Sequence, residues 1–120
     1  MNGQVDSLGR ALVTVSLRAS GATATHDVQA WIDKGFNGDL VLPQKQIENL
    51  GLPESGTAKA VLADGSEINV QRYVCNNDWF GEQRELEVIA NAGEYPLVGV
   101  GLLLGLDLHI SYRSGEITID

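Results

Sequence analysis

The sequence predicts a small, mainly antiparallel all-β protein, a barrel or a sandwich, with one or two short helices. Three observations lead to this fold class. Apolar and polar residues alternate in several segments, and in 11–18 the apolar positions are Val13, Val15 and Leu17. Turn signals separate these segments, and the 120-residue chain contains 14 glycines, as a turn-rich β protein would. Because no linker or low-complexity tract interrupts the pattern, we expect a single domain over 1–120.

The segments 11–18 and 26–33 predict a first β-hairpin, because both alternate and the small and polar residues between them are typical of a turn. A short helix is predicted at 44–50, since Pro43 suits the first helical position and Gly51 suits the residue after the last turn. Further strands are predicted at 68–74, 84–90, 106–112 and 116–119, and 40–42 is a short apolar run.

Three further turns are predicted from their residue types. Asp64 and Gly65 tolerate the positive φ angles of a two-residue type I′ turn, so they predict a tight hairpin whose second arm begins near Ile68. The run 76–81 is rich in Asn and Asp and ends in glycine, which predicts another turn. A last turn is predicted at 113–115, before the final strand.

The charge balance argues against two classes of partner. Eight Lys and Arg residues against 16 Asp and Glu residues give a net charge of −8. Such a surface repels phosphate groups, so we expect neither nucleic acid nor an anionic membrane as a partner. No stretch approaches the ~20 apolar residues that span a bilayer. Residues 1–15 lack the basic start and apolar run of a signal peptide, so a cytoplasmic setting is expected.

The composition also argues against a metal or a cofactor. Cys75 is the one cysteine, so neither an intrachain disulfide nor a multi-cysteine metal site can form. His26 and His109 lack a second ligand type at metal-binding spacing, and we interpret them as surface or structural residues. No phosphate-binding glycine pattern is present. We therefore expect no metal and no cofactor.

One arrangement singles out an acidic residue. Asp33 ends an apolar strand and directly precedes the glycine-rich turn 35–38. Further along the chain, the segment 96–99 is again predicted to be an apolar strand, and it ends in Gly99. Taken alone, these residues also allow a simpler interpretation, in which Asp33 accepts hydrogen bonds from nearby turn amides.

The segment 32–38 resembles the active site of the retropepsin-like (retroviral-type) aspartic proteases, specifically of the small single-lobe bacterial type. In that family an apolar strand is followed by Asp-Thr-Gly or Asp-Ser-Gly, often with an aromatic residue and a second glycine. Asp33, Gly35, Phe36 and Gly38 match this pattern. Lys34 departs from it, because the family has Thr or Ser there.

Three more family elements follow in the right order, so that the resemblance covers roughly residues 5–120. The segment 43–52 resembles the part of the family that follows the active-site turn. The flap, a hairpin that covers the substrate, corresponds to Ala63, Asp64, Gly65 and Ser66. A second apolar element ending in glycine and leading into a short helix corresponds to Leu97, Val98 and Gly99 followed by 100–105.

This resemblance implies a small closed β barrel of the acid-protease type, with one lobe per chain. It implies an aspartic endopeptidase in which Asp33 of each of two protomers activates water between the two carboxyl groups, so that the active enzyme is a homodimer. An extended peptide or unfolded protein would lie in the groove between protomers, paired with main-chain groups of the flap.

Lys34 implies a weakened site, because a long ammonium cannot make the compact contact of the family's hydroxyl across the dimer axis. Paired with Asp33, it would also favour the ionised acid, whereas catalysis needs one protonated carboxyl. Two alternatives stay open. The chain could be a catalytically inactive peptide-binding or assembly module of the same fold, or an unrelated small β barrel in which Asp33 caps a turn.

Overall fold

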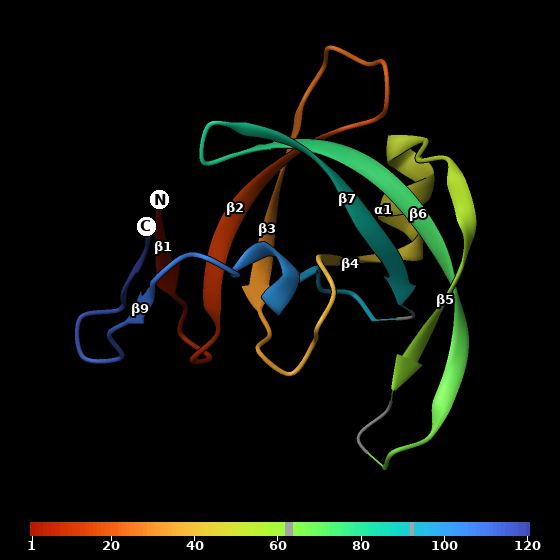
Figure 1. The fold of residues 1–120 in the computed structure, drawn as a ribbon. Helices are drawn as coiled ribbons and strands as arrows, with labels where there is room; N and C mark the ends of the chain where they lie inside the picture. The colour runs from red at the N-terminus through yellow and green to blue at the C-terminus, as the bar shows by residue number, and fades with distance from the viewer. Residues whose placement is uncertain (62–63, 92) are drawn as a thin grey trace.

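The computed structural model describes residues 1–61, 64–91 and 93–120, and these form ten strands, one α-helix and one 3-10 helix (Figure 1). The strands are β1 (Asn2–Val5), β2 (Ala11–Arg18), β3 (His26–Ile32), β4 (Leu40–Pro43), β5 (Glu54–Val61), β6 (Glu67–Trp79), β7 (Glu82–Asn91), β8 (Leu97–Val98), β9 (Leu108–Ile110) and β10 (Glu116–Ile119). The helices are α1 (Gln44–Leu50) and the 3-10 helix η1 (Val100–Leu102). The protein is therefore mainly β, as the alternating segments predict.

All ten strands belong to one sheet, in the order β5-β6-β7-β4-β8-β3-β2-β1-β10-β9. The sheet is strongly curled. As a result, β6 and β2, which are not neighbours in this order, also pair with each other. Most neighbours are antiparallel, but β3 pairs with β8 and β4 pairs with β7 in parallel. Figure 1 shows the two termini side by side, because β1 pairs with β10.

The predicted hairpin of β2 and β3 is confirmed, with Val15 opposite Val28. Alternate residues of both strands face the core, as their period of two requires. The largest fully buried side chains come from four strands (β2, β4, β7 and β10), from α1 and from η1: Leu17, Leu40, Leu42, Ile47, Leu86, Leu102, Ile117 and Ile119. The core thus lies inside the curled sheet and supports β3, the strand that leads into Asp33.

The short helix is also confirmed at the predicted residues. Gly51 ends it in the left-handed conformation, with φ of 65°, and its N–H donates to Glu48 O. Pro43 differs slightly from expectation. It is the last residue of β4 and the N-cap of α1, with extended ψ of 142°, rather than the first helical residue.

The turn predicted at 76–81 is wrong in extent. β6 continues to Trp79, and only Phe80 and Gly81 form the connection to β7, with φ angles of 52° and 82°. Asn77 and Trp79 face the core, and the amide of Asn77 donates to Ser16 O at 2.7 Å, which ties β6 to β2. Burial of alternate residues therefore overrides the turn propensity of Asn and Asp.

Two other strand predictions need correction. β9 covers only 108–110 of the predicted strand 106–112, because the chain is still turning when it leaves η1. The structure also contains β1, which the sequence did not predict. It has four residues, too few to show a clear alternation, and its pairing with β2 and β10 is what makes it a strand. No helix in the described parts of the chain is long and apolar enough to cross a membrane.

Candidate active site

Asp33 directly follows β3 and begins a tight turn. Its main-chain N–H donates to Val98 O at 2.8 Å, which continues the parallel pairing of β3 with β8. Its carboxylate Oδ1 accepts the N–H of Gly35 at 2.9 Å, and its main-chain oxygen accepts the N–H of Phe36 at 3.2 Å. The side chain is half-buried. The turn thus fixes one carboxylate oxygen, while Oδ2 has no hydrogen bond to any described residue.

The turn after Asp33 is held by the segment after β8. Three main-chain hydrogen bonds join the two segments: Gly99 N–H to Asp39 O (2.9 Å), Val100 N–H to Phe36 O (2.8 Å) and Gly101 N–H to Gly38 O (2.9 Å). The two elements that the sequence singled out, 33–38 and 97–99, are therefore brought together although about sixty positions separate them in the chain. Their mutual bonds make the Asp33 turn a rigid platform.

The packing explains why glycine occupies two of these positions. A Cβ on Gly99 would overlap Gly38 O and the Phe36 ring, and a Cβ on Gly38 would overlap the same ring. The aromatic residue of the pattern therefore packs against both glycines, and neither position has room for a side chain.

Asp39 is a residue that the sequence analysis missed. Its carboxylate Oδ2 accepts the N–H of Glu87 on β7 at 3.0 Å, and its Oδ1 lies where a Cβ on Gly101 would stand. It anchors the Asp33 turn to β7 and so acts as a positioning residue. The available signal was an acid directly after the second glycine of the turn, but nothing in the pattern identified its partner.

Lys34 points its side chain to solvent. Four ion pairs occur within the described residues, and none includes Lys34 or Asp33. The direct Lys34–Asp33 pair considered from the sequence is therefore not formed within one chain.

Hollows lie on both sides of this turn. One, of about 300 Å³, is lined by Trp31, Ile32, Asp33, Lys34 and Leu97. The Trp31 side chain is 41% exposed there and meets the Tyr95 ring edge-on, while Arg10 lies over Tyr95 at 4.4 Å. The other, of about 320 Å³, lies between the turn and β5 and is lined by 35–38, 59–61, Glu87 and Ile89. The first hollow therefore lies beside Asp33, and the second lies beside the residues that follow it in the turn.

The predicted flap corresponds to the hairpin of β5 and β6, which projects from the lobe at the lower right of Figure 1. The last described pair of this hairpin joins Val61 to Glu67. Ala63 lies outside the described residues. Gly65 has φ of 86°, in the left-handed region that the predicted Asp-Gly turn needs at that position.

The side chain of Asp64 explains the shape of this tip. Its Oδ1 accepts both the hydroxyl of Ser66, at 2.5 Å, and the N–H of Ser66, at 2.9 Å. These two hydrogen bonds hold the pKa of this exposed carboxyl below its usual value, and the bond from the hydroxyl has the larger effect. The tip of the described hairpin is thus an Asx turn.

The described residues contain no cluster of three or more His, Cys, Asp or Glu side chains suited to a metal ion. What the site offers is one carboxylate on a rigid turn, beside two hollows and a projecting hairpin.

Comparison with protein-family models and with curated proteins found no match. Among solved structures, the crystal structure of a retropepsin-like aspartic protease from Rickettsia conorii matches with a TM-score of 0.64 and 15% identity, covering 99% of this chain and 88% of that one. The retroviral protease-like domain of Ddi1 from Leishmania major matches with a TM-score of 0.46 and 14% identity, covering 91% and 88%. The first match confirms the architecture that the resemblance implied: this chain has the fold of a retropepsin-like aspartic protease.

Proposed function

We propose that this chain is one half of a homodimeric aspartic endopeptidase, with Asp33 as the catalytic residue of each protomer. The observation that carries the proposal is the placement of Asp33. Asp33 is half-buried on a turn that is hydrogen-bonded to the 97–101 segment. It lines one hollow, and a second hollow lies along the rest of the same turn. An acid that merely capped a turn would need neither the main-chain hydrogen bonds to the 97–101 segment nor the neighbouring hollows.

Hydrolysis by an aspartic dyad needs one ionised carboxyl to activate water and one protonated carboxyl to polarise the scissile carbonyl. Two carboxyls held close together provide both forms, because like charges at short range cannot both ionise easily. This chain provides one acid in such a setting. A second copy, related by a two-fold axis, provides the other.

The groove suits an extended peptide. β5 is an edge strand of the sheet, so its outer main-chain groups are free to pair with a substrate strand. The hollow beside Asp33 is walled by Trp31 and Leu97, which favours a large apolar side chain next to the cleaved bond. Asp64, Gly65 and Ser66 would then lie at the tip of the hairpin that closes over the bound peptide, with Ala63 adjacent in the chain.

The second candidate is a peptide-binding module of the same fold without catalytic activity. Lys34 favours it, because two ammonium groups near the dimer axis would keep both carboxyls ionised and would lack the family's compact hydroxyl contact. The two candidates share the groove and differ only in the chemistry at Asp33.

The test is cleavage of casein between about pH 3 and 7, a range that brackets carboxyl titration. We expect weak cleavage by the natural chain, confined to the acidic end. Lys34→Thr should raise the rate about tenfold or more, because it restores a small neutral donor, and Asp33→Asn should abolish cleavage in either background. Lys45→Thr, which removes an exposed lysine on α1, is the matched control and should change nothing.

Two results would count against the enzyme. If folded, dimeric Lys34→Thr protein still fails to cleave at any pH, the peptide-binding module is the better description. If the natural chain cleaves casein and Asp33→Asn cleaves equally well, the aspartic mechanism is wrong.

A further inference from the structure

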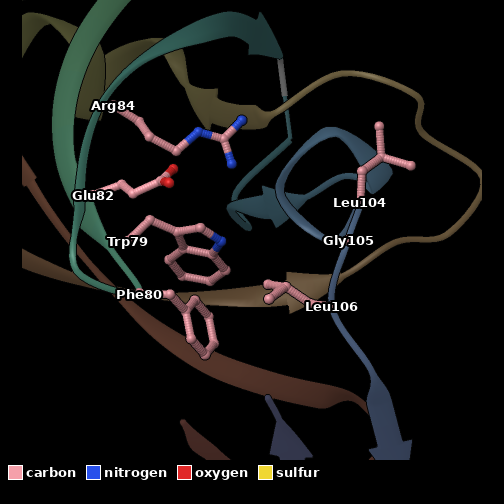
Figure 2. Close-up of a pocket in the computed structure, with 7 residues that line it drawn as sticks. All are labelled: Trp79, Phe80, Glu82, Arg84, Leu104, Gly105 and Leu106. Carbon is pink, nitrogen blue, oxygen red and sulfur yellow. The ribbon is translucent and has the colours of Figure 1, made fainter.

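A separate hollow of about 300 Å³ lies at the far end of β6, which starts at the flap hairpin and ends at Trp79. Two chain segments wall it: the β6–β7 hairpin and the stretch that follows η1. Figure 2 shows its lining residues: Trp79, Phe80, Glu82, Arg84, Leu104, Gly105 and Leu106. None of them belongs to the Asp33 turn, to the flap tip or to the two hollows beside Asp33.

The two walls are fixed to each other. The indole N–H of Trp79 donates to Leu102 O at 2.9 Å in a buried hydrogen bond, and Arg84 Nη2 reaches Gly101 O at 3.5 Å. The hollow is therefore preformed, as small-molecule sites usually are.

Its mouth exposes apolar side chains that folding does not require there. Leu104 is 72% exposed and Phe80 is 42% exposed. Phe80 also has φ of 52°, in the left-handed region that Asn or Gly would occupy with less strain, and it contacts the Trp79 ring edge-on at 5.1 Å. Strained residues that are kept in place often belong to functional sites.

The charged groups of the hollow are Arg84 and Glu82. Figure 2 shows the Arg84 guanidinium and the Glu82 carboxylate on the same side of the hollow, above the Trp79 side chain in this view. Arg84 is half-buried and takes part in none of the ion pairs formed by the described residues. Among the described residues, its planar fork of N–H donors makes a single long contact, to a main-chain oxygen, and it lines the hollow.

We propose that this hollow binds a carboxylate carried on a large apolar group. The carboxylate pairs with the Arg84 guanidinium, and the apolar group lies between the aromatic wall of Trp79 and Phe80 and the leucine wall opposite. The volume suits one residue or a ligand of that size. Two sources supply this chemistry, the C-terminal residue of a peptide and a free arylalkyl acid. Glu82 favours the peptide, because its carboxylate can accept the N–H that such a residue carries.

The experiment is an NMR titration of the whole chain with three probes. N-acetyl-L-phenylalanine represents the peptide C-terminus, 3-phenylpropionate represents the free acid, and N-acetyl-L-phenylalaninamide lacks the charge. The readout is the indole N–H signal of Trp79, which Trp31→Phe distinguishes from the other indole. We expect a saturable shift of the Trp79 signal with N-acetyl-L-phenylalanine and binding weaker by about tenfold or more with the amide.

Variants of the walls complete the test. Arg84→Gln should weaken binding of both acids by about tenfold or more, whereas Arg113→Gln, which removes an exposed arginine in the β9–β10 turn, should leave it unchanged. Leu104→Ala should weaken binding as well, and its 72% exposure makes it safe for folding. Glu82→Gln should weaken the binding of N-acetyl-L-phenylalanine more than the binding of 3-phenylpropionate.

Three results would each overturn the proposal. They are equal binding of acid and amide, unchanged affinity in Arg84→Gln and Leu104→Ala, and no saturable shift of the Trp79 indole signal.

Discussion

Cys75 shows how burial makes a single side chain sensitive to pH. Its side chain is fully buried on β6, and desolvation, together with the nearby Asp39 carboxylate, raises the pKa of the thiol to about 12 from an ordinary 9.0. Above pH 9 the unfolded chain therefore loses a proton that the folded chain keeps. The unfolded state then binds fewer protons, so stability must fall as pH rises between about 9 and 12.

We expect this loss to approach about 1.4 kcal/mol per pH unit. The measurement is urea unfolding at a series of pH values from about 8 to 10.5, compared between the natural chain and Cys75→Ala. Lysines and tyrosines titrate in both proteins, so the difference between the two curves isolates the thiol. Parallel curves would show that Cys75 does not cause a pH-dependent loss.

At the same scale, the sequence could predict which residues form a local motif but not which residues long-range packing brings to that motif. Asp33, Gly35 and Phe36 form a local pattern, and they lie together as expected. Asp39 could not be assigned, because its partner is an N–H on β7, far away in the chain. The orientation of Lys34 could not be predicted either, since an exposed lysine side chain has no pattern of its own.

Among the elements, we expect the hydrogen-bonded contact between the Asp33 turn and the 97–101 segment to be the most sensitive to substitution. Gly99→Ala places a methyl group against Gly38 O and the Phe36 ring, in a buried site with no room to yield. We expect it to lower the free energy of unfolding by about 3 kcal/mol, the upper part of the range for overpacking. Gly93→Ala is the matched control, because its nearest contact would be an ordinary 3.5 Å.

Urea unfolding of both variants checks this expectation. Gly93→Ala should be neutral or slightly stabilising, because alanine reduces the freedom of the unfolded chain. Equal stability of the two variants would mean that the contact between the Asp33 turn and the 97–101 segment can separate at no cost in free energy. The conclusion that the Asp33 turn is rigid would then be wrong.

Element prediction succeeded where a segment was long enough to show its period and failed where pairing decided the outcome. β2 and β3 alternate clearly and are strands over nearly the expected residues. β1 has four residues and is defined by its pairing with β2 and β10, which no local pattern encodes. β6 was cut short in prediction because Asn76–Asp78 have turn propensity, which burial of Asn77 outweighs.

For the whole molecule, the sequence predicted the mainly antiparallel β class. The strand pairings that curl the sheet into one lobe were found only in the structure. The pairing of β6 with β2 and the two parallel pairs connect segments far apart in the chain, and their register depends on the curl of the entire sheet. That curl places the Asp33 turn and β5 on opposite sides of one hollow. The candidate site is therefore a property of the whole lobe.

The last prediction concerns association of two lobes. Each protomer carries a net charge of −8, so two copies repel each other, and added salt should strengthen the dimer by screening that repulsion. Sedimentation equilibrium should show twice the protomer mass at tens of micromolar, about 50 μM for instance, with tighter association in high salt.

The axis itself can be tested by reversing one charge. In the proposed dimer Lys34 lies beside the axis, next to two Asp33 carboxylates, so Lys34→Glu would gather four acids there. We expect the dimer Kd to rise about tenfold or more, because like charges brought together at an interface oppose association. Lys45→Glu makes the same change in net charge on the exposed face of α1 and should raise the Kd far less. Equal effects of the two variants would show that only net charge matters and that Lys34 is not near the axis. A protein that stays monomeric at every salt concentration would have no second Asp33 carboxyl, and the proposed dyad would be wrong.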